Sequence, residues 1–345
     1  MATKGPRMQT KRPSMKDVAQ LAGVSRTTVS YVLNGAAEAA NIPEETKARV
    51  HAAVEQLGYR PNAIAQGLRS NKSNILGFIA DEIATTPFSG NIIKGAQDAA
   101  WKHGKVLYIV NTDRQPTLEE AAVDTMLERQ VEGILFAAMF HREITSPANL
   151  HEVPTVLVNC YSQDHSLPSI VPDEVEGGCI ATEFLLNKGH RRIAMISGKP
   201  HLPATTGRIE GFRQAHAAKN LPIDESLMRF GGWWQENGYE STLELLSLPD
   251  RPTAIFCAND RIAMGAYGAV KELGLSIPGD VAVMGFDNQE VIAAHLRPKL
   301  TTVALPYYEM GKWAVEYLIE HVGHEEPSDP RQVKLRCPLI VRESV

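Results

Sequence analysis

The sequence predicts an α/β protein that begins with a small all-helical domain and continues into two doubly wound parallel-sheet subdomains. Three observations support this fold. The chain has 345 residues, which is long enough for two or three domains. Residues 14–60 contain short helical segments and no strand pattern. From Asn74 onward, apolar strand-like runs alternate with helical segments in two successive series, as in parallel sheets covered by helices on both faces.

Three helices are expected between residues 14 and 60, because residues that favour helix starts and helix stops alternate along this stretch. Ser14 and Ser25 are suited to cap helix N-termini. Pro43 suits the first turn of a helix, and Gly58 suits its end. The expected helices cover residues 15–22, about 25–33 and about 43–57.

Polar segments without periodicity flank this helical domain. Residues 1–13 (MATKGPRMQTKRP) are basic, and we expect them to form a disordered tail. Residues 61–72 (PNAIAQGLRSNK) are expected to form a linker that contains one short helix. A helix of this length is marginal when it is alone in water.

The remaining residues, 73–345, are expected to form two subdomains side by side, with about five strands in each. The first is expected to contain about residues 73–173 and 303–332, and the second about residues 174–302 and 333–345. The chain then passes between them several times, and the late elements shared in this way are a strand at 301–305, a helix at 307–322 and a strand at 333–341.

Composition is typical of a globular protein from a reducing compartment. Apolar residues make up 43% of the chain and charged residues 22%. The four cysteines lie far apart, without a C-x-x-C pair or a His/Cys cluster, so we expect no metal site, no disulfide framework and no cofactor. We see neither a signal-peptide pattern nor an apolar run of about 20 residues, and therefore expect a cytoplasmic protein without a membrane span.

Charge is distributed unevenly along the chain. The net charge of −5 by itself argues against a polyanionic partner. Residues 1–72, however, contain 11 Lys and Arg but only 5 Asp and Glu, whereas residues 73–345 contain 24 and 35. A basic head on an acidic body suits docking of the head to phosphates. Chance clustering with a basic tail is the alternative explanation.

The segment MKDVAQLAGVSRTTVSYVLNG (15–35) has the strongest functional pattern in the chain. A helix-turn-helix needs a small residue where its helices cross and a turn residue that tolerates positive φ, and Ala19 and Gly23 fit these two roles. Its second helix needs a cap, a buried apolar residue and exposed polar side chains near its start. These roles fit, in order, Ser25, Val29 and the set Arg26, Thr27 and Tyr31. An ordinary αα-hairpin in a helical bundle is the alternative.

The same segment resembles a known family. The run D-V-A-x-x-A-G-V-S-x-x-T-V-S-x-V-L-N-G, followed by R-P-N-x-x-A-x-x-L, is similar to the lactose-repressor/galactose-repressor (LacI/GalR) family of bacterial transcriptional regulators. The resemblance extends from Met15 to the terminal V-R-E-S-V. It includes the segments DEVEGG (173–178), GHRRIA (189–194), R-x-x-G-F (208–212), AND (258–260), GDVAVMGFD (279–287) and LTTV (300–303).

The resemblance implies sequence-specific DNA binding by the helix-turn-helix. Arg26, Thr27 and Tyr31 would face base edges in the major groove, where an arginine suits a guanine. Residues that contact the DNA backbone would hold the register without reading sequence. These backbone-positioning residues are Ser25, Thr28, Ser30 and Asn34.

In the family, the linker corresponding to residues 61–69 forms a hinge helix on operator DNA. The resemblance implies that Leu68 inserts into the minor groove of the operator. It also implies a near-palindromic operator, because a two-fold dimer carries two identical DNA-reading domains. A core leucine is the alternative role for Leu68. The chain shows no C-terminal heptad repeat of the kind that makes the lactose repressor a tetramer, so we expect a homodimer.

Polar and aromatic side chains follow the apolar strands of the second part. Ligands of doubly wound folds bind beyond the carboxyl ends of their strands. A set of carboxylates, amides, one arginine and one indole suits a polyhydroxylated ring. A helix cap is the alternative role for an Asp or Asn at such a position. The residues concerned are Asn159, Arg208, Trp233, Asn259, Asp260 and Asp287.

The resemblance places five of these residues, Asn159, Arg208, Trp233, Asn259 and Asp287, at positions that contact the small-molecule effector. It adds Phe88 and Ser89 as lining residues and Asp81 as a weaker candidate, and implies that Asp260 braces the following helix. The doubled Trp233-Trp234 departs from the common family pattern and leaves open which indole faces the ligand.

The family mechanism implied is that the effector changes closure of the two subdomains and thereby orders or melts the hinge helices. Whether the effector releases or promotes operator binding, and whether the chain represses or activates, stays open. We expect a sugar as effector, with a purine or nucleoside as the alternative and a phosphorylated sugar ranked lower, because few cationic groups accompany the set.

Other classes of function fit less well. We find no phosphate-binding glycine loop, no G-x-S-x-G and no H-E-x-x-H, and the 11 histidines are scattered, mainly where surface residues are expected, so we expect no enzyme. A periplasmic sugar receptor would share the sensor fold but has no use for the DNA-reading head. A nucleoid-organising protein would have no use for the large second part.

Overall fold

The structure, a computed structural model, describes residues 13–34, 37–60, 73–85, 89–321 and 331–345. The chain divides into a small unit, Met1–Ser73, and a large unit, Asn74–Val345. Among the described residues, no helix is long and apolar enough to cross a membrane.

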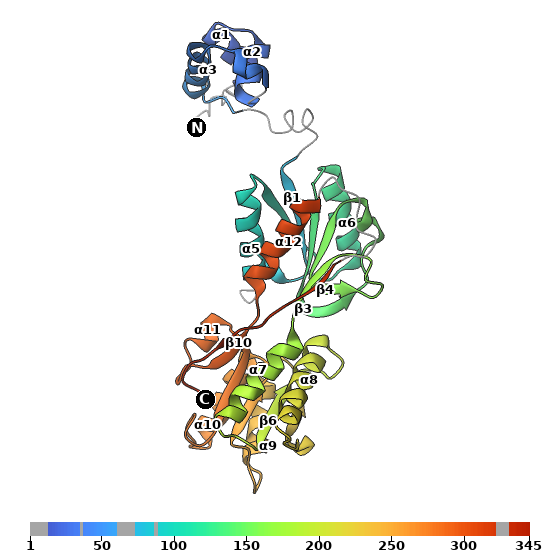
Figure 1. Cartoon of the computed structure of the whole chain (residues 1–345), viewed down its shortest axis with the longest axis vertical. Coiled ribbons are helices and arrows are strands. Elements are labelled where there is room, and N and C mark those ends of the chain that lie inside the picture. The colour runs from blue at the N-terminus through green and yellow to red at the C-terminus, as the bar shows by residue number, and fades with distance from the viewer. Residues whose placement is uncertain (1–12, 35–36, 61–72, 86–88, 322–330) are drawn as a thin grey trace, which may run out of the picture. The chain divides into compact units, whose positions relative to one another are not determined.

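The small unit contains three α-helices, α1 (Met15–Ala22), α2 (Arg26–Asn34) and α3 (Glu44–Leu57), and a 3₁₀ turn at Ala37–Asn41 (Figure 1). Gly23 has φ of 66° and turns the chain between α1 and α2, a conformation that glycine adopts without strain. The core consists of small and β-branched residues that let the helices approach closely, namely Val18, Ala19, Ala22, Val29, Val50 and Ala53.

The three expected helices are thus present, and the third begins one residue later than expected. Pro43 precedes α3 as its N-cap, with φ of −55° and ψ of 141°. Ser14 caps α1 in a capping box, in which Asp17 Oδ2 accepts hydrogen bonds from Ser14 N and Oγ, both at 2.7 Å.

The large unit contains two six-stranded sheets, each flanked by helices on both faces (Figure 1). The strand order in the first sheet is β11-β5-β4-β3-β1-β2, and in the second it is β12-β10-β9-β8-β6-β7. All neighbouring strands are parallel except the pair β10 and β12. This arrangement follows from continuous apolar runs, such as Ile75–Ala80, which are buried on both faces.

The strands of the first sheet are β1 (Ile75–Ala80), β2 (Val106–Asn111), β3 (Ile134–Ile144), β4 (Thr155–Ser162), β5 (Ser169–Pro172) and β11 (Gln332–Leu335). The strands of the second are β6 (Ile193–Ser197), β7 (Met228–Phe230), β8 (Ala254–Cys257), β9 (Ala282–Asp287), β10 (Thr301–Ala304) and β12 (Leu339–Ile340).

Helices α5 (Gly90–Lys102) and α12 (Tyr307–His321) pack on one face of the first sheet and α6 (Pro116–Glu128) on the other. Helices α7 (Glu174–Asn187) and α8 (Pro203–Ala218) cover one face of the second sheet. Its other face is covered by α9 (Gln235–Leu246) and α10 (Asp260–Glu272), and α11 (Glu290–Ala293) follows β9.

Three segments carry the chain between the subdomains: β5 to α7, β10 to α12, and β11 to β12. The last of these differs from the expected boundary at residue 333. Residues 332–335 pair with β5 and so belong to the first sheet, and only Leu339–Ile340 pair with β10. The expected strand at 333–341 is therefore two short strands, one in each subdomain.

Candidate functional site

The first candidate surface is the start of α2. Ser25 caps this helix, because its Oγ accepts a hydrogen bond from Thr28 N at 3.0 Å and lies 2.9 Å from Thr28 Oγ1. Val29 is fully buried against α1 and α3 and fixes the rotation of the helix. Arg26 and Thr27 are consequently exposed, and Tyr31 is half-buried one turn further on.

The other residues expected to bind DNA lie in different environments. Thr28 is half-buried and engaged with the cap, and Ser30 is only 5% exposed, so it faces the interior of the small unit more than solvent. Asn34 is the last residue of α2. Leu68 and the expected hinge helix lie outside the described residues.

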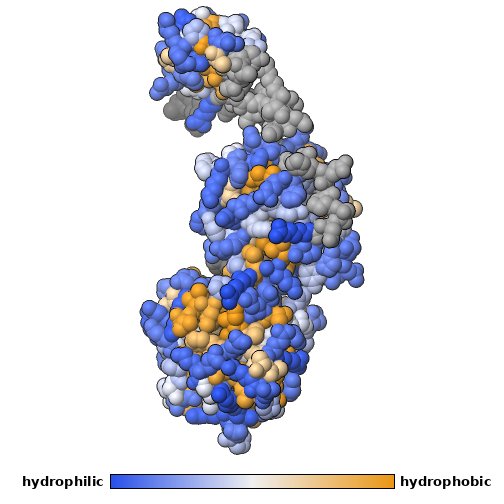
Figure 2. Space-filling view, viewed as in Figure 1, coloured by the Kyte–Doolittle hydropathy of each residue, from blue (hydrophilic) through white to orange (hydrophobic). Residues whose placement is uncertain are grey.

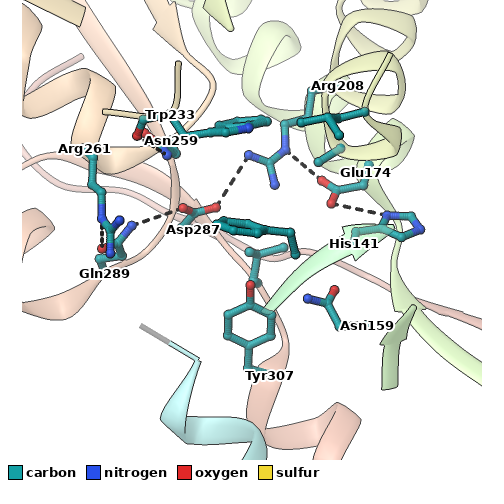
Figure 3. A pocket seen from close by; sticks show the side chains of 14 residues that line it. His141, Asn159, Glu174, Arg208, Trp233, Asn259, Arg261, Asp287, Gln289 and Tyr307 are labelled. Atoms are coloured by element: carbon teal, nitrogen blue, oxygen red, sulfur yellow. Dashed lines mark hydrogen bonds and ion pairs between the residues drawn. The ribbon is translucent and has the colours of Figure 1, made fainter. Parts of the chain in front are cut away.

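The second candidate site is a pocket between the two sheets of the large unit (Figure 3). The end of β3, β4 and the start of α12 line it from the first subdomain, and the second subdomain contributes α7, α8 and the loops after β7, β8 and β9. Five of the seven expected effector residues lie here: Asn159, Arg208, Trp233, Asn259 and Asp287.

Arg208 is at the centre of the charged groups in this pocket and is only 3% exposed. Its Nε donates to Glu174 Oε2 at 2.7 Å, and its Nη1 lies 3.5 Å from Asp287 Oδ1 and donates to the carbonyl of Ala258. The guanidinium also lies over the Phe286 ring, 3.7 Å from the ring centroid. Burial opposes the charge, but the two carboxylates outweigh it and raise the pKa of Arg208, which stays charged.

The two carboxylates that hold Arg208 differ in their affinity for protons. Burial raises the pKa of Asp287 to about 7 although Arg208 opposes the shift. Burial acts on Glu174 in the same direction, but Arg208 and His141 together lower the pKa of this carboxyl. Near neutral pH, Glu174 is therefore charged while Asp287 exchanges a proton, so Asp287 can both accept and donate hydrogen bonds to a ligand.

Trp233, and not Trp234, lines the pocket. Asn259 fixes this segment by two hydrogen bonds: its Nδ2 donates to the Trp233 carbonyl at 3.1 Å, and its Oδ1 accepts from Ile262 N at 2.8 Å as the cap of α10. The Trp234 side chain is 61% exposed and lies under the Arg261 guanidinium at 4.7 Å. The sequence left open which of the two indoles faces the ligand, and the structure places Trp233 in the pocket.

Two buried polar atoms from the first subdomain face the pocket. Asn159 Nδ2 donates to the carbonyls of Ala138 and Met139 at 3.0 and 3.1 Å. Among the described residues, neither Asn159 Oδ1 nor His141 Nδ1 has a hydrogen-bond partner. A buried polar atom without a partner is unfavourable, so these atoms suit a ligand that supplies hydrogen-bonding groups.

Two residues of the pocket have a left-handed backbone conformation. Asp287 has φ of 98° and Asn159 has φ of 59°, in the region that glycine adopts freely and that, among other residues, asparagine and aspartate tolerate best. Residues held in this way cluster at ligand sites, where the surrounding structure fixes them.

The remaining expected residues that the structure describes do not line the pocket. Ser89 is fully buried and precedes α5 as its N-cap, and Phe88 lies outside the described residues. Asp81 accepts from Met139 N at 2.8 Å and pairs with Arg142 at 3.4 Å, so it braces the first subdomain. Asp260 braces the second subdomain, as expected, by accepting from Thr302 Oγ1 and Gln289 N, both at 2.6 Å.

Sequence reasoning missed several lining residues, of which His141, Glu174, Arg261, Gln289 and Tyr307 are polar. His141 was expected to be a surface residue, yet its side chain is only 12% exposed. The strand-end rule that found Asn159 applies equally to His141, near the end of β3. Glu174 and Tyr307 each begin a helix directly after the chain crosses between subdomains, a signal that requires the crossovers to be located first.

Comparisons with known proteins cover both units of the chain. Residues 14–62 match the model "Bacterial regulatory proteins, lacI family", and residues 182–345 match "Periplasmic binding protein-like domain". The chain is 32% identical to the HTH-type transcriptional repressor PurR of Vibrio vulnificus (strain CMCP6), over 96% of this chain and 98% of that protein.

Solved structures give the same picture. The transcriptional regulator CelR in complex with cellobiose is 29% identical with a TM-score of 0.67, over 97% of this chain and all of that one. The lac repressor dimer bound to operator and the anti-inducer ONPF is 26% identical with a TM-score of 0.80, over 97% of this chain and 99% of that one.

Proposed function

Because this chain belongs to the lacI family of bacterial regulatory proteins, which bind DNA and regulate transcription, we propose that it is a repressor controlled by a small molecule in the pocket around Arg208. It binds a near-palindromic operator as a homodimer, with Arg26, Thr27 and Tyr31 reading bases. The observation that carries the proposal is the buried network of Arg208, Glu174 and Asp287 in a pocket that both subdomains line.

A sugar or glycoside is the effector that the pocket chemistry favours. Arg208 is already paired with two carboxylates, so it offers a small anion little unpaired charge. Asp287 near its pKa and the acceptor Asn159 Oδ1 suit hydroxyl groups, which both donate and accept. The indole of Trp233 suits the C–H face of a pyranose ring. The CelR–cellobiose complex is a relative with a sugar ligand.

A purine is the second candidate. It is favoured by relatives named PurR that are 30–32% identical over almost the whole chain. A planar base would stack on Trp233 and present ring nitrogens to Asn159 and Asp287. The two candidates require the same side chains and differ in shape, so a direct binding measurement decides between them.

Effector binding is proposed to act through closure of the two subdomains, because the pocket is lined from both. A ligand shifts operator occupancy only if it binds one closure state better than the other. A hundredfold preference corresponds to about 2.7 kcal/mol of coupling. The pocket is proposed to bind and regulate, and no catalytic role is proposed for it. As a regulator of chromosomal genes, the protein is proposed to act in the cytoplasm.

Exposed apolar side chains on the large unit support the proposed dimer. Val106 and Ile109 are 44% and 38% exposed on the edge strand β2, and Val291 on α11 is 70% exposed. Figure 2 shows hydrophobic side chains gathered on the surface of the large unit. A contiguous apolar patch, unlike a single exposed side chain, is typical of a contact surface, and the lac repressor relative is a dimer bound to operator.

The test is a ligand screen on the purified full-length chain. Melting temperature and tryptophan fluorescence are measured against mono- and disaccharides, sugar phosphates, purines and nucleosides, because a ligand of the native state raises the melting temperature. A saturable response to a sugar that is lost in Arg208→Ala and Asp287→Ala supports the sugar proposal. A response to purines alone replaces it with the second candidate, and no response to either class contradicts both.

A further inference from the structure

Two buried side chains from different subdomains meet in the wall of the pocket. We propose that His141 and Glu174 form an ion pair that draws the two subdomains together, and that loss of the proton on His141 releases this contact. The inference concerns regulation of the pocket and rests on the proposed function above.

One carboxylate faces a basic side chain from each subdomain (Figure 3). Glu174 is the first residue of α7 and follows the crossover from β5, so it lies where the two subdomains join. Its Oε2 accepts from Arg208 Nε at 2.7 Å within the second subdomain. Its Oε1 lies 3.6 Å from Nδ1 of His141, which belongs to β3 of the first subdomain. The carboxylate thus connects the arginine at the ligand site to the opposite wall of the pocket.

The separation of 3.6 Å is informative because it permits an ion pair but exceeds a hydrogen bond. Both side chains are poorly exposed, 12% for His141 and 4% for Glu174, so solvent screens their attraction less than at the surface. A slight further closure would bring the two atoms within hydrogen-bond distance. The contact to Arg208 stays within one subdomain and does not depend on closure.

Protonation of His141 determines whether the bridge carries a full ion pair. Glu174 faces the imidazole from α7, and Tyr161 of β4 meets it edge-on at 5.8 Å between ring centroids. Arg208 and Asp287 act on it through Glu174. An imidazole gains a positive charge as the pH falls. The closed arrangement is therefore favoured at the acid end of the pH range, and the bridge weakens as the pH rises.

His141 also lines a second, open groove outside the pocket, with Tyr161, His165 and Lys334. The imidazole thus forms part of the partition between the ligand pocket and this groove.

The test measures cleft closure in the full-length chain without ligand or DNA. Spin labels are placed at two exposed positions, one in each subdomain, by Glu152→Cys and Lys219→Cys. The half-exposed Cys179 is replaced by serine, and the other three cysteines are buried. The distance distribution between the labels is recorded by pulsed electron paramagnetic resonance from about pH 5.5 to 8.

We expect the distribution to shift toward longer distances as the pH rises through this range. His141→Gln is expected to give the longer distribution at every pH, and Glu174→Gln to do the same. His141→Gln is the decisive variant, because it leaves the Arg208–Glu174 pair intact and is less prone to misfold. The matched control for the histidine is His165→Gln, on the far side of Tyr161. The matched control for the carboxylate is Glu176→Gln, two residues along α7 and paired with the exposed Arg336. Both variants are expected to give the same distance distributions as the parent chain.

The proposal is overturned if His141→Gln keeps the parent distribution at every pH. It is also overturned if the pH dependence survives in His141→Gln and disappears in Asp287→Asn, since the titrating group would then be Asp287. Because the measurement needs neither ligand nor operator, these outcomes are independent of whether the ligand screen succeeds.

Discussion

Gly198 lies so close to Trp233 that a Cβ atom at position 198 would come within 2.3 Å of two indole carbons. Gly198 follows β6, and the Trp233 ring that packs against it lines the ligand pocket. The absence of a side chain at position 198 therefore sets the position of the aromatic wall on which a ligand would lie.

Gly198→Ala is expected to displace the indole and weaken ligand binding at least tenfold, because the added methyl occupies the space of the Trp233 ring. Ligand affinity by titration calorimetry and near-ultraviolet circular dichroism would report the two effects. Gly268→Ala is a matched control, since the nearest atom to a Cβ there is a Tyr239 carbon at an ordinary 3.6 Å. Unchanged affinity in Gly198→Ala would contradict the role assigned to Trp233.

The two adjacent tryptophans are expected to respond differently to ligand. Trp233 lines the pocket, whereas Trp234 is 61% exposed and stacks with Arg261. In Trp233→Phe, the ligand-induced change in fluorescence should disappear and the affinity should fall about tenfold or more, consistent with loss of ~1.4 kcal/mol of contact. Trp234→Phe should keep both. If Trp234→Phe lost both the fluorescence change and the affinity while Trp233→Phe kept them, Trp234 and not Trp233 would contact the ligand.

Asp287 is expected to make stability depend on pH. Its pKa of about 7 in the folded chain exceeds the ordinary value of 3.8. Between about pH 4 and 7 the folded state holds a proton that the unfolded state releases, so the free energy of unfolding falls as pH rises through this window. Asp287→Asn removes this effect, and at about pH 8 the variant should be more stable than the parent by about 1–3 kcal/mol. Below about pH 4 the two should agree.

Urea unfolding across this pH range checks the expectation. Asp224 provides the contrast, because hydrogen bonds from Ser226 and Arg192 lower the pKa of this exposed carboxyl. Asp224→Asn should therefore gain no stability at about pH 8. A parent stability that rises between pH 5 and 7, or an Asp287→Asn variant less stable at pH 8, would show that the ionised carboxylate is well accommodated.

The sequence predicts those features of the fold that depend on the conformational preferences of neighbouring residues. Gly23 in a turn and Ser14 and Ser25 as helix caps follow from the conformational preferences of single residues, and the structure has them in these roles. Asn159 and Asp287 were found because parallel strands end at one edge, so their positions follow from the predicted order of strands and helices.

What the sequence could not predict depends on pairing between distant segments. The division of residues 332–341 into β11 and β12 arises because β11 pairs with β5, some 160 residues earlier. Glu174 and Tyr307 became lining residues only through the crossovers that bring helix starts to the cleft. Ser89, in contrast, was expected in the pocket only from the family resemblance, and it is fully buried at the start of α5. Such orientations depend on packing that a single sequence does not specify.

The buried network around Arg208 is expected to be strongly coupled in stability. Arg208→Met leaves Glu174 and Asp287 without their cation, and breaking a buried pair in this way costs about 3–5 kcal/mol. The double variant Arg208→Met/Glu174→Gln removes a charge of each sign and should recover part of that loss. Arg213→Met, on the exposed side of the same helix and paired with Glu225 at 3.2 Å, should change stability by less than about 1 kcal/mol. Additive losses in the double variant would contradict the coupling.

Arg26 is expected to determine operator sequence without contributing to the fold. It is exposed at the start of α2, one residue after the Ser25 cap, so Arg26→Ala should leave the melting temperature unchanged. If its guanidinium contacts a guanine, the variant should lose about 1–3 kcal/mol of preference at one base pair of each half-site. Selection of binding sequences from a random DNA pool would detect this as relaxed specificity at two symmetric positions. Lys16→Ala, exposed on α1, should weaken binding uniformly or leave it unchanged. If Arg26→Ala selected the same sequences as the parent chain, base reading would have to be assigned to Thr27 and Tyr31 alone.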